Sequence, residues 1–396
     1  MIVLIIPEKP KITKFTGRAK FCYTGDTMDL ECLATDTNDP ALAFSWNSDS
    51  GMYTVSNKAS VSWKAPLSAG VYKVQCTVSN SLGLSSDTSL YILVKPKNIG
   101  DQMPLIYYPF DNDTRDYSGN HYDAILNGAI PTTDALNRQH SAYKFSSGSE
   151  IIYTPNSTAL NFQDKITISF WVEADQITEE SFVVSHGSWE ERYKVSITPD
   201  RKLRWTVKTD KGTRDLDNTV ALALTTFYHF TVTYTGYSME IYINGDLDDF
   251  IPMNGKIQQT SKDLTIGRKD RPVTTYHMNG TIDEVRIYNA ELSLPQIKTL
   301  PSLWNTLTGV TNATLHEISV YPNPSSGKIN LTLSHGELPT SIEAFDMTGR
   351  KLTDFRIEPS GPNNIIIDFT NSYRGFVLFR IKYVTGIDFF KILFQR

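Results

Sequence analysis

The 396-residue sequence contains only three cysteines, a small net charge and no long hydrophobic run. Three cysteines are too few for a disulfide-rich scaffold or for a structural zinc site, which takes about four closely spaced ligands. The 38 Lys and Arg residues against 43 Asp and Glu residues leave a net charge of −5, with no basic run to attract nucleic acid. No apolar stretch approaches the roughly 20 residues that a membrane-spanning helix requires. We therefore expect a globular protein that neither binds nucleic acid nor spans a membrane.

The motifs of several enzyme classes are also missing. The sequence contains no H-E-x-x-H zinc motif, no glycine-rich phosphate loop and no G-x-S-x-G nucleophile turn. It also lacks the E-x-D-x-x-E strand of jelly-roll glycosidases, whose retaining members place two carboxylates about 5–5.5 Å apart. Asp283 and Glu284 are neighbours in a predicted strand, where successive side chains point to opposite faces, so they do not form such a pair. The sequence therefore predicts a non-catalytic protein.

What the chain does contain favours β-structure. Its 20 Tyr and 19 Phe residues are typical of strands, and its length predicts two to three domains. Residues 203–208 alternate between apolar and polar side chains, as in an antiparallel sheet with one solvated face. By their phase in such patterns, Trp171 and Trp205 are expected in the core of one domain, and Trp46 and Trp63 in the core of another. We predict an all-β protein.

The central part of the chain carries an ordered series of strand motifs. The stretch G-T-I-D-E-V-R-I-Y at 280–288 is preceded by motifs at 105–116 (LIYYPFDNDTRD), 142–145 (AYKF), 166–172 (ITISFWV), 239–245 (MEIYING) and 264–268 (LTIGR). In their order and spacing these motifs resemble the laminin-G-like, or concanavalin-A-like, jelly roll. The resemblance implies a jelly roll over 104–303, in which the last strand pairs beside the first.

The N-terminal part, residues 1–97, resembles an immunoglobulin-like (PKD-like) β-sandwich of bacterial surface proteins. The resemblance rests on Cys32, Trp46, the W-K-A-P sequence at 63–66, the G-x-Y sequence at 70–72, and Cys76. It implies a Cys32–Cys76 disulfide between the sheets, although Cys76 lies four residues after the tyrosine and not two, as in antibody domains. The alternative is a pair of buried free thiols that act as small hydrophobic side chains. Cys22 is left over in either case.

The C-terminal part, residues 313–396, carries a third set of motifs. These are Y-P-N-P-x-x-G at 321–327, D-x-x-G-R-K-L at 346–352 and a basic-apolar strand near the end, at 391–393. They resemble the sorting domain of proteins exported by the type IX (Por) secretion system of Bacteroidetes. The resemblance implies export through the periplasm to the cell surface or the medium, with the type IX machinery as a partner and the sorting domain generally removed. The alternative is a third ordinary β-domain.

A calcium site is the metal site that the sequence favours. Ca²⁺ takes six to eight oxygen ligands from carboxylates, amides and carbonyls, and residues 111–120 form an oxygen-rich loop. Related jelly rolls often carry a structural calcium ion that joins the first and last strands. The resemblance ranks Asp111 and Asp283 first as ligands, followed by Asp113, Asp116 and Glu284. The alternative is a metal-free loop of Asx turns with hydrogen-bonded carboxylates.

The same resemblance implies a secreted or cell-surface protein that binds carbohydrate, or an adhesion protein, with the immunoglobulin-like domain as a spacer. Sugar sites combine aromatic faces with a few polar groups. The candidates, among which the sequence does not choose, are Trp189, Tyr193, Arg204, Tyr237, Arg268 and Tyr276. Two alternatives stay open. One is an extracellular protein–protein adhesion module, and the other is the accessory region of a larger glycan-degrading enzyme whose catalytic domain lies upstream of Met1. All of these functions rest on fold resemblance alone.

Overall fold

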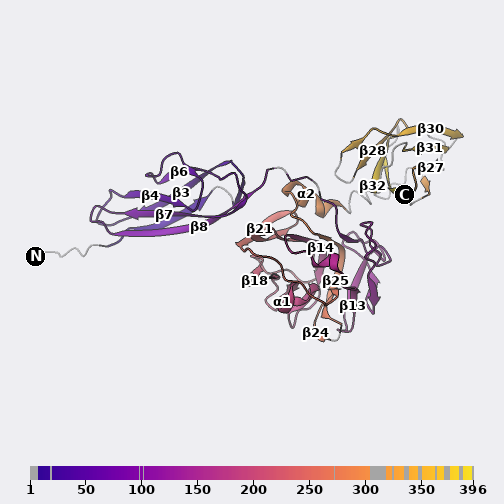
Figure 1. The fold of residues 1–396 in the computed structure, drawn as a ribbon, viewed down its shortest axis with the longest axis horizontal. Helices are drawn as coiled ribbons and strands as arrows, with labels where there is room; N and C mark the ends of the chain where they lie inside the picture. Colours follow the sequence, from indigo (N-terminus) through magenta and orange to yellow (C-terminus); the bar gives the residue numbers. More distant parts are fainter. Residues whose placement is uncertain are drawn as a thin grey trace, which may run out of the picture. The chain divides into compact units, whose positions relative to one another are not determined.

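The computed structural model describes residues 8–17, 20–97, 99–100, 102–271, 273–303, 318–322, 325–333, 339–346, 350–361, 364–369, 375–382 and 387–394 (Figure 1). Contacts divide the chain into two compact units. One unit comprises residues 1–116 and 122–293, and the other comprises 117–121 and 294–396. Within the described residues nearly all regular structure is strand, which confirms the all-β prediction. No helix in this part of the chain is long and apolar enough to cross a membrane.

The N-terminal strands form two four-stranded sheets. The sheets are ordered β1 (Lys11–Gly17), β3 (Thr27–Thr35), β6 (Ser60–Lys64), β5 (Met52–Tyr53), and β2 (Phe21–Tyr23), β8 (Ser85–Lys95), β7 (Gly70–Ser79), β4 (Ala43–Ser48). Trp46 and Trp63 are buried in the core between them, as predicted. Cys32 and Cys76 are buried free thiols that lie close to each other. Burial, together with the contact with Cys32, raises the pKa of the Cys76 thiol to about 12. The disulfide between them stays a prediction.

The jelly roll consists of a seven-stranded and an eight-stranded sheet. The seven-stranded sheet is ordered β10 (Ile125–Asn127), β13 (Ile151–Thr154), β22 (Leu264–Ile266), β15 (Ser181–His186), β16 (Tyr193–Ile197), β17 (Leu203–Thr209), β18 (Gly212–Asp217). The eight-stranded sheet is ordered β11 (Ile130–Thr132), β12 (Ala142–Phe145), β25 (Gly280–Tyr288), β14 (Ile166–Ala174), β19 (Phe227–Tyr234), β20 (Ser238–Ile243), β21 (Asp246–Pro252), and β9 (Ile106–Tyr108) also pairs with β25. The predicted pairing of first and last strands is therefore confirmed.

Short elements complete this region. They are the hairpin β23 (Arg268–Asp270) and β24 (Val273–His277), the helices α1 (Ser188–Glu191) and α2 (Leu294–Thr299), and the 3-10 turns η1 (Thr158–Asn161) and η2 (Leu300–Ser302). Gly267 separates β22 from β23 at φ 82°, and a Cβ there would lie 2.1 Å from the ring of Phe145. Only glycine fits this corner without displacing a core side chain.

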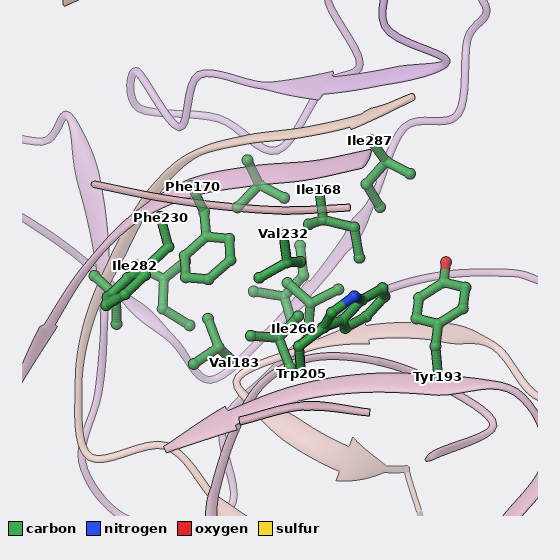
Figure 2. Packing of buried hydrophobic residues seen from close by; sticks show 14 of the residues in the cluster. Ile168, Phe170, Val183, Tyr193, Trp205, Phe230, Val232, Ile266, Ile282 and Ile287 are labelled. Atoms are coloured by element: carbon green, nitrogen blue, oxygen red, sulfur yellow. The ribbon is translucent and has the colours of Figure 1, made fainter. Parts of the chain in front are cut away.

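The jelly-roll core lies between the two sheets. Ile168, Phe170 and Phe230 of the eight-stranded sheet face Trp205 and Ile266 of the seven-stranded sheet, and all five are at most 1% exposed (Figure 2). Burial of each such side chain contributes roughly 1.5–3 kcal/mol. The prediction for Trp205 is confirmed.

Trp171 does not lie in this core, so the prediction for it is wrong. It is only partly buried and packs edge-on against His229, with ring centroids 5.4 Å apart. Because Phe170 points inward, its neighbour Trp171 on the same strand points outward.

The closing strand β25 contains a bulge. Its register against β14 pairs Arg286 with Ser169 and Asp283 with Trp171, so two residues of β25 lie opposite Phe170. Glu284 adopts a left-handed conformation with φ 55° at this point. The bulge gives Asp283 and Glu284 different environments, which are described below.

The C-terminal strands form two further four-stranded sheets with a core of their own. They are ordered β26 (Ile318–Tyr321), β27 (Lys328–Leu333), β31 (Asn364–Asp368), β30 (Arg356–Gly361), and β29 (Lys351–Leu352), β28 (Ser341–Asp346), β32 (Gly375–Lys382), β33 (Ile387–Phe394). Parts of the predicted sorting motifs, 323–324 and 347–349, lie outside the described residues, as does the predicted boundary region 304–317. The three predicted domain ranges stay predictions.

Candidate functional site

Three aromatic side chains meet on the outer face of the seven-stranded sheet, the face turned away from the core. Phe182 comes from β15, Trp189 from α1 and Tyr276 from β24. Ring centroids lie 5.8 Å apart for Phe182–Trp189, 5.3 Å for Phe182–Tyr276 and 5.5 Å for Trp189–Tyr276. Phe182 is buried beneath the other two, which are partly exposed. We call these three residues the aromatic cluster.

Tight local turns place the two exposed rings. Gly187 has φ 70°, and a Cβ at this position would lie 2.7 Å from the Thr260 hydroxyl, so the turn that carries Trp189 requires glycine. Tyr276 has φ 59°, and its backbone N–H donates to the Glu179 carboxylate at 3.1 Å. The same carboxylate lies 3.3 Å from Nδ1 of His277. Glu179 therefore fixes the hairpin end on which Tyr276 sits.

Two lysines lie against the aromatic cluster. Lys269 Nζ is 4.1 Å from the ring centroid of Trp189 and 5.3 Å from that of Tyr276, and it pairs with Glu190 at 3.1 Å. Lys194 Nζ is 5.0 Å from the ring centroid of Phe182 and pairs with Glu180. Burial lowers the pKa of Lys194, and this effect outweighs the attraction of Glu180. Cation–π contacts of this kind hold the rings in place.

Polar side chains extend the outer face beyond the aromatic cluster. On β16 and β17, Lys194, Ser196 and Arg204 point outward, whereas Val195 and Trp205 point into the core. Arg204 binds Asp217 of β18 through two hydrogen bonds of 2.7 and 2.8 Å. Lys194 and Ser196 are buried, whereas Arg204 and Asp217 are partly exposed. Exposed aromatic rings beside charged groups are the combination that sugar-binding sites use.

The predicted ligand-binding residues fall into two groups. Trp189 and Tyr276 belong to the aromatic cluster, and Arg204 lies on the same face. Tyr193 is 1% exposed and packs on Trp205 at 5.9 Å, because it shares its strand phase with Val195 and Ile197 (Figure 2). It does not reach a ligand, so its assignment was wrong.

Arg268 and Tyr237 have structural partners. The Arg268 guanidinium is buried and donates to the carbonyls of Ser149 at 3.0 Å and of Arg271 at 2.7 Å. The Tyr237 hydroxyl donates to Glu291 at 2.7 Å. Arg268 therefore ties two loops together, and Tyr237 lies outside the aromatic cluster.

Three members of this face were not predicted from the sequence, namely Phe182, Lys194 and Lys269. Phe182 lies in a run of apolar residues, so the sequence pattern does not show whether it points toward the core or away from it. The alternation of Y-K-V-S-I at 193–197 does signal that Lys194 points away from the core. No sequence signal connects Lys269 with Trp189.

A second group of charged residues lies at the junction of β9, β12 and β25. Asp283 is 1% exposed, and Asp134, in the connection from β11 to β12, is 3% exposed. Burial raises the pKa of Asp283 well above its usual value, and the negative charges of Glu284, Asp134 and Asp111 raise it further. We call Asp111, Asp134 and Asp283 the acidic cluster. Arg138 reaches into it, with Nε 2.5 Å from Asp134 and Nη1 3.7 Å from Asp111.

The other predicted calcium ligands have different partners. The carboxylate oxygens of Asp116 accept backbone N–H groups of Tyr107 at 2.9 Å and Tyr122 at 3.0 Å. Glu284 accepts from the Tyr107 hydroxyl at 3.0 Å and pairs with Arg286 at 2.5 Å.

Asp113, the remaining predicted ligand, accepts the backbone N–H of Arg115 at 3.1 Å. Among the residues that the structure describes, no three carboxylate, imidazole or thiol side chains are arranged to hold a metal ion. With Arg138 among the carboxylates, the side chains as placed do not fit calcium.

Two parts of the chain match models of known protein families. Residues 146–298 match the family model described as "Concanavalin A-like lectin/glucanases superfamily". The chain contains a concanavalin A-like domain. Residues 319–393 match the model of the secretion system C-terminal sorting domain. The chain is therefore exported by type IX secretion, to the cell surface or the medium. No curated protein matches the sequence.

The solved structures that match this chain are only distantly similar to it. Domain 4 of AbnA, a GH43 extracellular arabinanase from Geobacillus stearothermophilus in complex with arabinotriose, is 18% identical, with 51% of this chain and 99% of that chain covered and a TM-score of 0.42. The binding domain of Paraclostridial Mosquitocidal Protein 1 is 14% identical, with 72% and 76% covered and a TM-score of 0.43. Such scores indicate only a loose similarity of shape.

Proposed function

We propose that the concanavalin A-like domain binds carbohydrate on the outer face of its seven-stranded sheet, centred on Trp189 and Tyr276. The observation that carries this proposal is the aromatic cluster, in which two partly exposed rings are held over Phe182. Sugars stack on such rings through their C–H faces, and nearby charged groups orient their hydroxyls. Arg204 of β17 and Asp217 of β18, whose paired side chains are 31% and 30% exposed, supply those groups on the same face.

We also propose that the protein is not an enzyme. Asp283 and Glu284, the adjacent carboxylates of the closing strand, are buried at 1% and 2% exposure and have partners within the protein. They present no carboxylate pair to a substrate. The N-terminal sandwich would act as a spacer, and the sorting domain would deliver the binding domain to the outer surface or the medium.

The test is a glycan array probed with the full chain. We compare the wild type with Trp189→Ala and with the control Tyr91→Ala, which removes a 51% exposed aromatic ring from the N-terminal sandwich. The proposal expects binding to a defined set of glycans by the wild type and by Tyr91→Ala, and its loss in Trp189→Ala. Equal binding by all three proteins would place the sugar site elsewhere.

Protein–protein adhesion is the second candidate function. The edge strands β10 and β11 expose Ile125 (45%), Leu126 (41%) and Ile130 (59%), and exposed apolar groups on sheet edges mark interaction surfaces. An array on which the folded wild type binds no glycan would favour this candidate over the first.

A further inference from the structure

The acidic cluster joins three separate segments of the concanavalin A-like domain. Asp111 follows the opening strand β9, Asp134 lies between β11 and β12, and Asp283 is part of the closing strand β25. The strands β9 and β12 both pair with β25, so the cluster lies where the first and last parts of the domain meet. Two of its carboxylates are almost fully buried, and buried carboxylates are costly unless a positive charge or a proton compensates them.

The backbone conformation of the loop from β11 to β12 places Arg138 beside these carboxylates. Asp134 accepts the backbone N–H groups of Leu136 at 2.9 Å and of Arg138 at 2.8 Å, and Asn137 adopts φ 63°. The Arg138 side chain folds back, with Nε 2.5 Å from Oδ2 of Asp134, and is only 23% exposed. The guanidinium therefore binds the same carboxylate that organises its own loop.

Arg138 also lies close to Asp111. Its Nη1 lies 3.7 Å from Asp111, and the charges of Asp111, Asp134 and Asp283 all stabilise its protonated form. A guanidinium keeps its charge at every accessible pH and presents five donors in a planar fork, which suits it to several carboxylates at once.

We propose that Arg138 is the resident counter-cation of Asp111 and Asp134, beside Asp283, in the place where the family resemblance puts a structural calcium ion. The junction between the opening and closing strands is then stable without a metal. Calcium would need six to eight oxygen ligands. Asp116 and Glu284, which the resemblance offers as further ligands, are hydrogen-bonded to backbone amides and to Tyr107 and Arg286.

The test measures thermal unfolding of the full chain in millimolar CaCl₂ and in excess chelator. The variants are Arg138→Ala and Arg138→Lys, with Arg115→Ala as the control, because Arg115 is 76% exposed and pairs with Asp113 in the neighbouring loop. We expect the wild type, Arg115→Ala and Arg138→Lys to have the same melting temperature under both conditions. Arg138→Ala should melt several degrees lower in chelator and recover in calcium, because the vacated cluster can then bind the ion.

Three results would overturn the proposal. The first is a wild-type melting temperature that rises in calcium and falls in chelator. The second is an Arg138→Ala variant as stable in chelator as the wild type. The third is an Arg138→Ala variant that is destabilised and does not respond to calcium, which would show that the arginine and the ion do not share one place.

If Arg138→Ala does not fold, the wild type and Arg138→Lys still decide the question by their response to calcium. A double variant, Arg138→Ala with Asp283→Asn, should lose any calcium response that Arg138→Ala gains. Because no sugar is involved, these results are independent of the carbohydrate-binding proposal.

Discussion

The bulge in β25 predicts a large loss of stability for Glu284→Gln. Glu284 and Arg286 are 2% and 3% exposed, and their side chains lie 2.5 Å apart. The Arg286 guanidinium also lies 4.1 Å from the ring centroid of Tyr107. Removing one partner of a buried ion pair typically costs about 3–5 kcal/mol, because the other charge is left without compensation. Glutamine has nearly the same size as glutamate and adopts φ 55° at the same cost. The loss of stability therefore measures the contribution of the Glu284 charge.

Differential scanning calorimetry of the full chain measures this loss. In a domain of this size, 1 kcal/mol shifts the melting temperature by about 2–4 °C, so the jelly-roll transition should fall by roughly 6–20 °C. The control is Arg115→Ala, which breaks an exposed pair worth less than about 1 kcal/mol. A Glu284→Gln shift no larger than that of the control would refute the reasoning, because Arg286 would then be balanced by another group.

Two further predictions concern pH and oxidation. Burial, with smaller contributions from Arg192 and Arg286, lowers the pKa of His186 and of His229 from 6.5 to about 3, so unfolding takes up protons between these values. Stability is therefore complete above pH 6.5 and falls as the pH drops toward 3, by about 1.4 kcal/mol per pH unit for each histidine. The free energy of unfolding, measured with urea, should fall less steeply between pH 6.5 and 5 in His229→Gln than in the wild type. An equally steep fall in both proteins would contradict the lowered pKa of His229. Export through the periplasm, which is oxidising, should join Cys32 and Cys76, so non-reducing peptide mapping of the secreted protein should find this pair linked and Cys22 free, whereas alkylation of all three would contradict it.

Much of the fold was predictable because strand patterns are local. The alternation in 203–208 and the G-T-I-D-E-V-R-I-Y sequence correctly indicated β17 and β25. The strand phase of Trp46, Trp63 and Trp205 correctly placed them in two separate cores. Trp171 was misplaced because Phe170 and Trp171 are adjacent and both apolar, so the pattern allows either phase. Only the neighbouring strands decide which ring points inward.

The candidate site was predictable only in part. Trp189 and Tyr276 were identified as single residues, but their meeting depends on the pairing of distant strands. The burial of Tyr193 was readable from its phase with Val195 and Ile197, and that signal was overlooked. Asp134 and Arg138 carry no motif, since a carboxylate and an arginine four residues apart in a loop are common, and their significance appears only when Asp283 lies beside them.

The central claim is that sugar binds on the aromatic cluster, and calorimetric titration tests it most directly. The ligand is the oligosaccharide that the array identifies, titrated into the wild type, Trp189→Ala and Tyr91→Ala. Truncation of a central aromatic contact typically costs about 2 kcal/mol, so the account predicts roughly thirtyfold weaker binding by Trp189→Ala and unchanged binding by Tyr91→Ala. Wild-type affinity in a correctly folded Trp189→Ala variant would contradict the account.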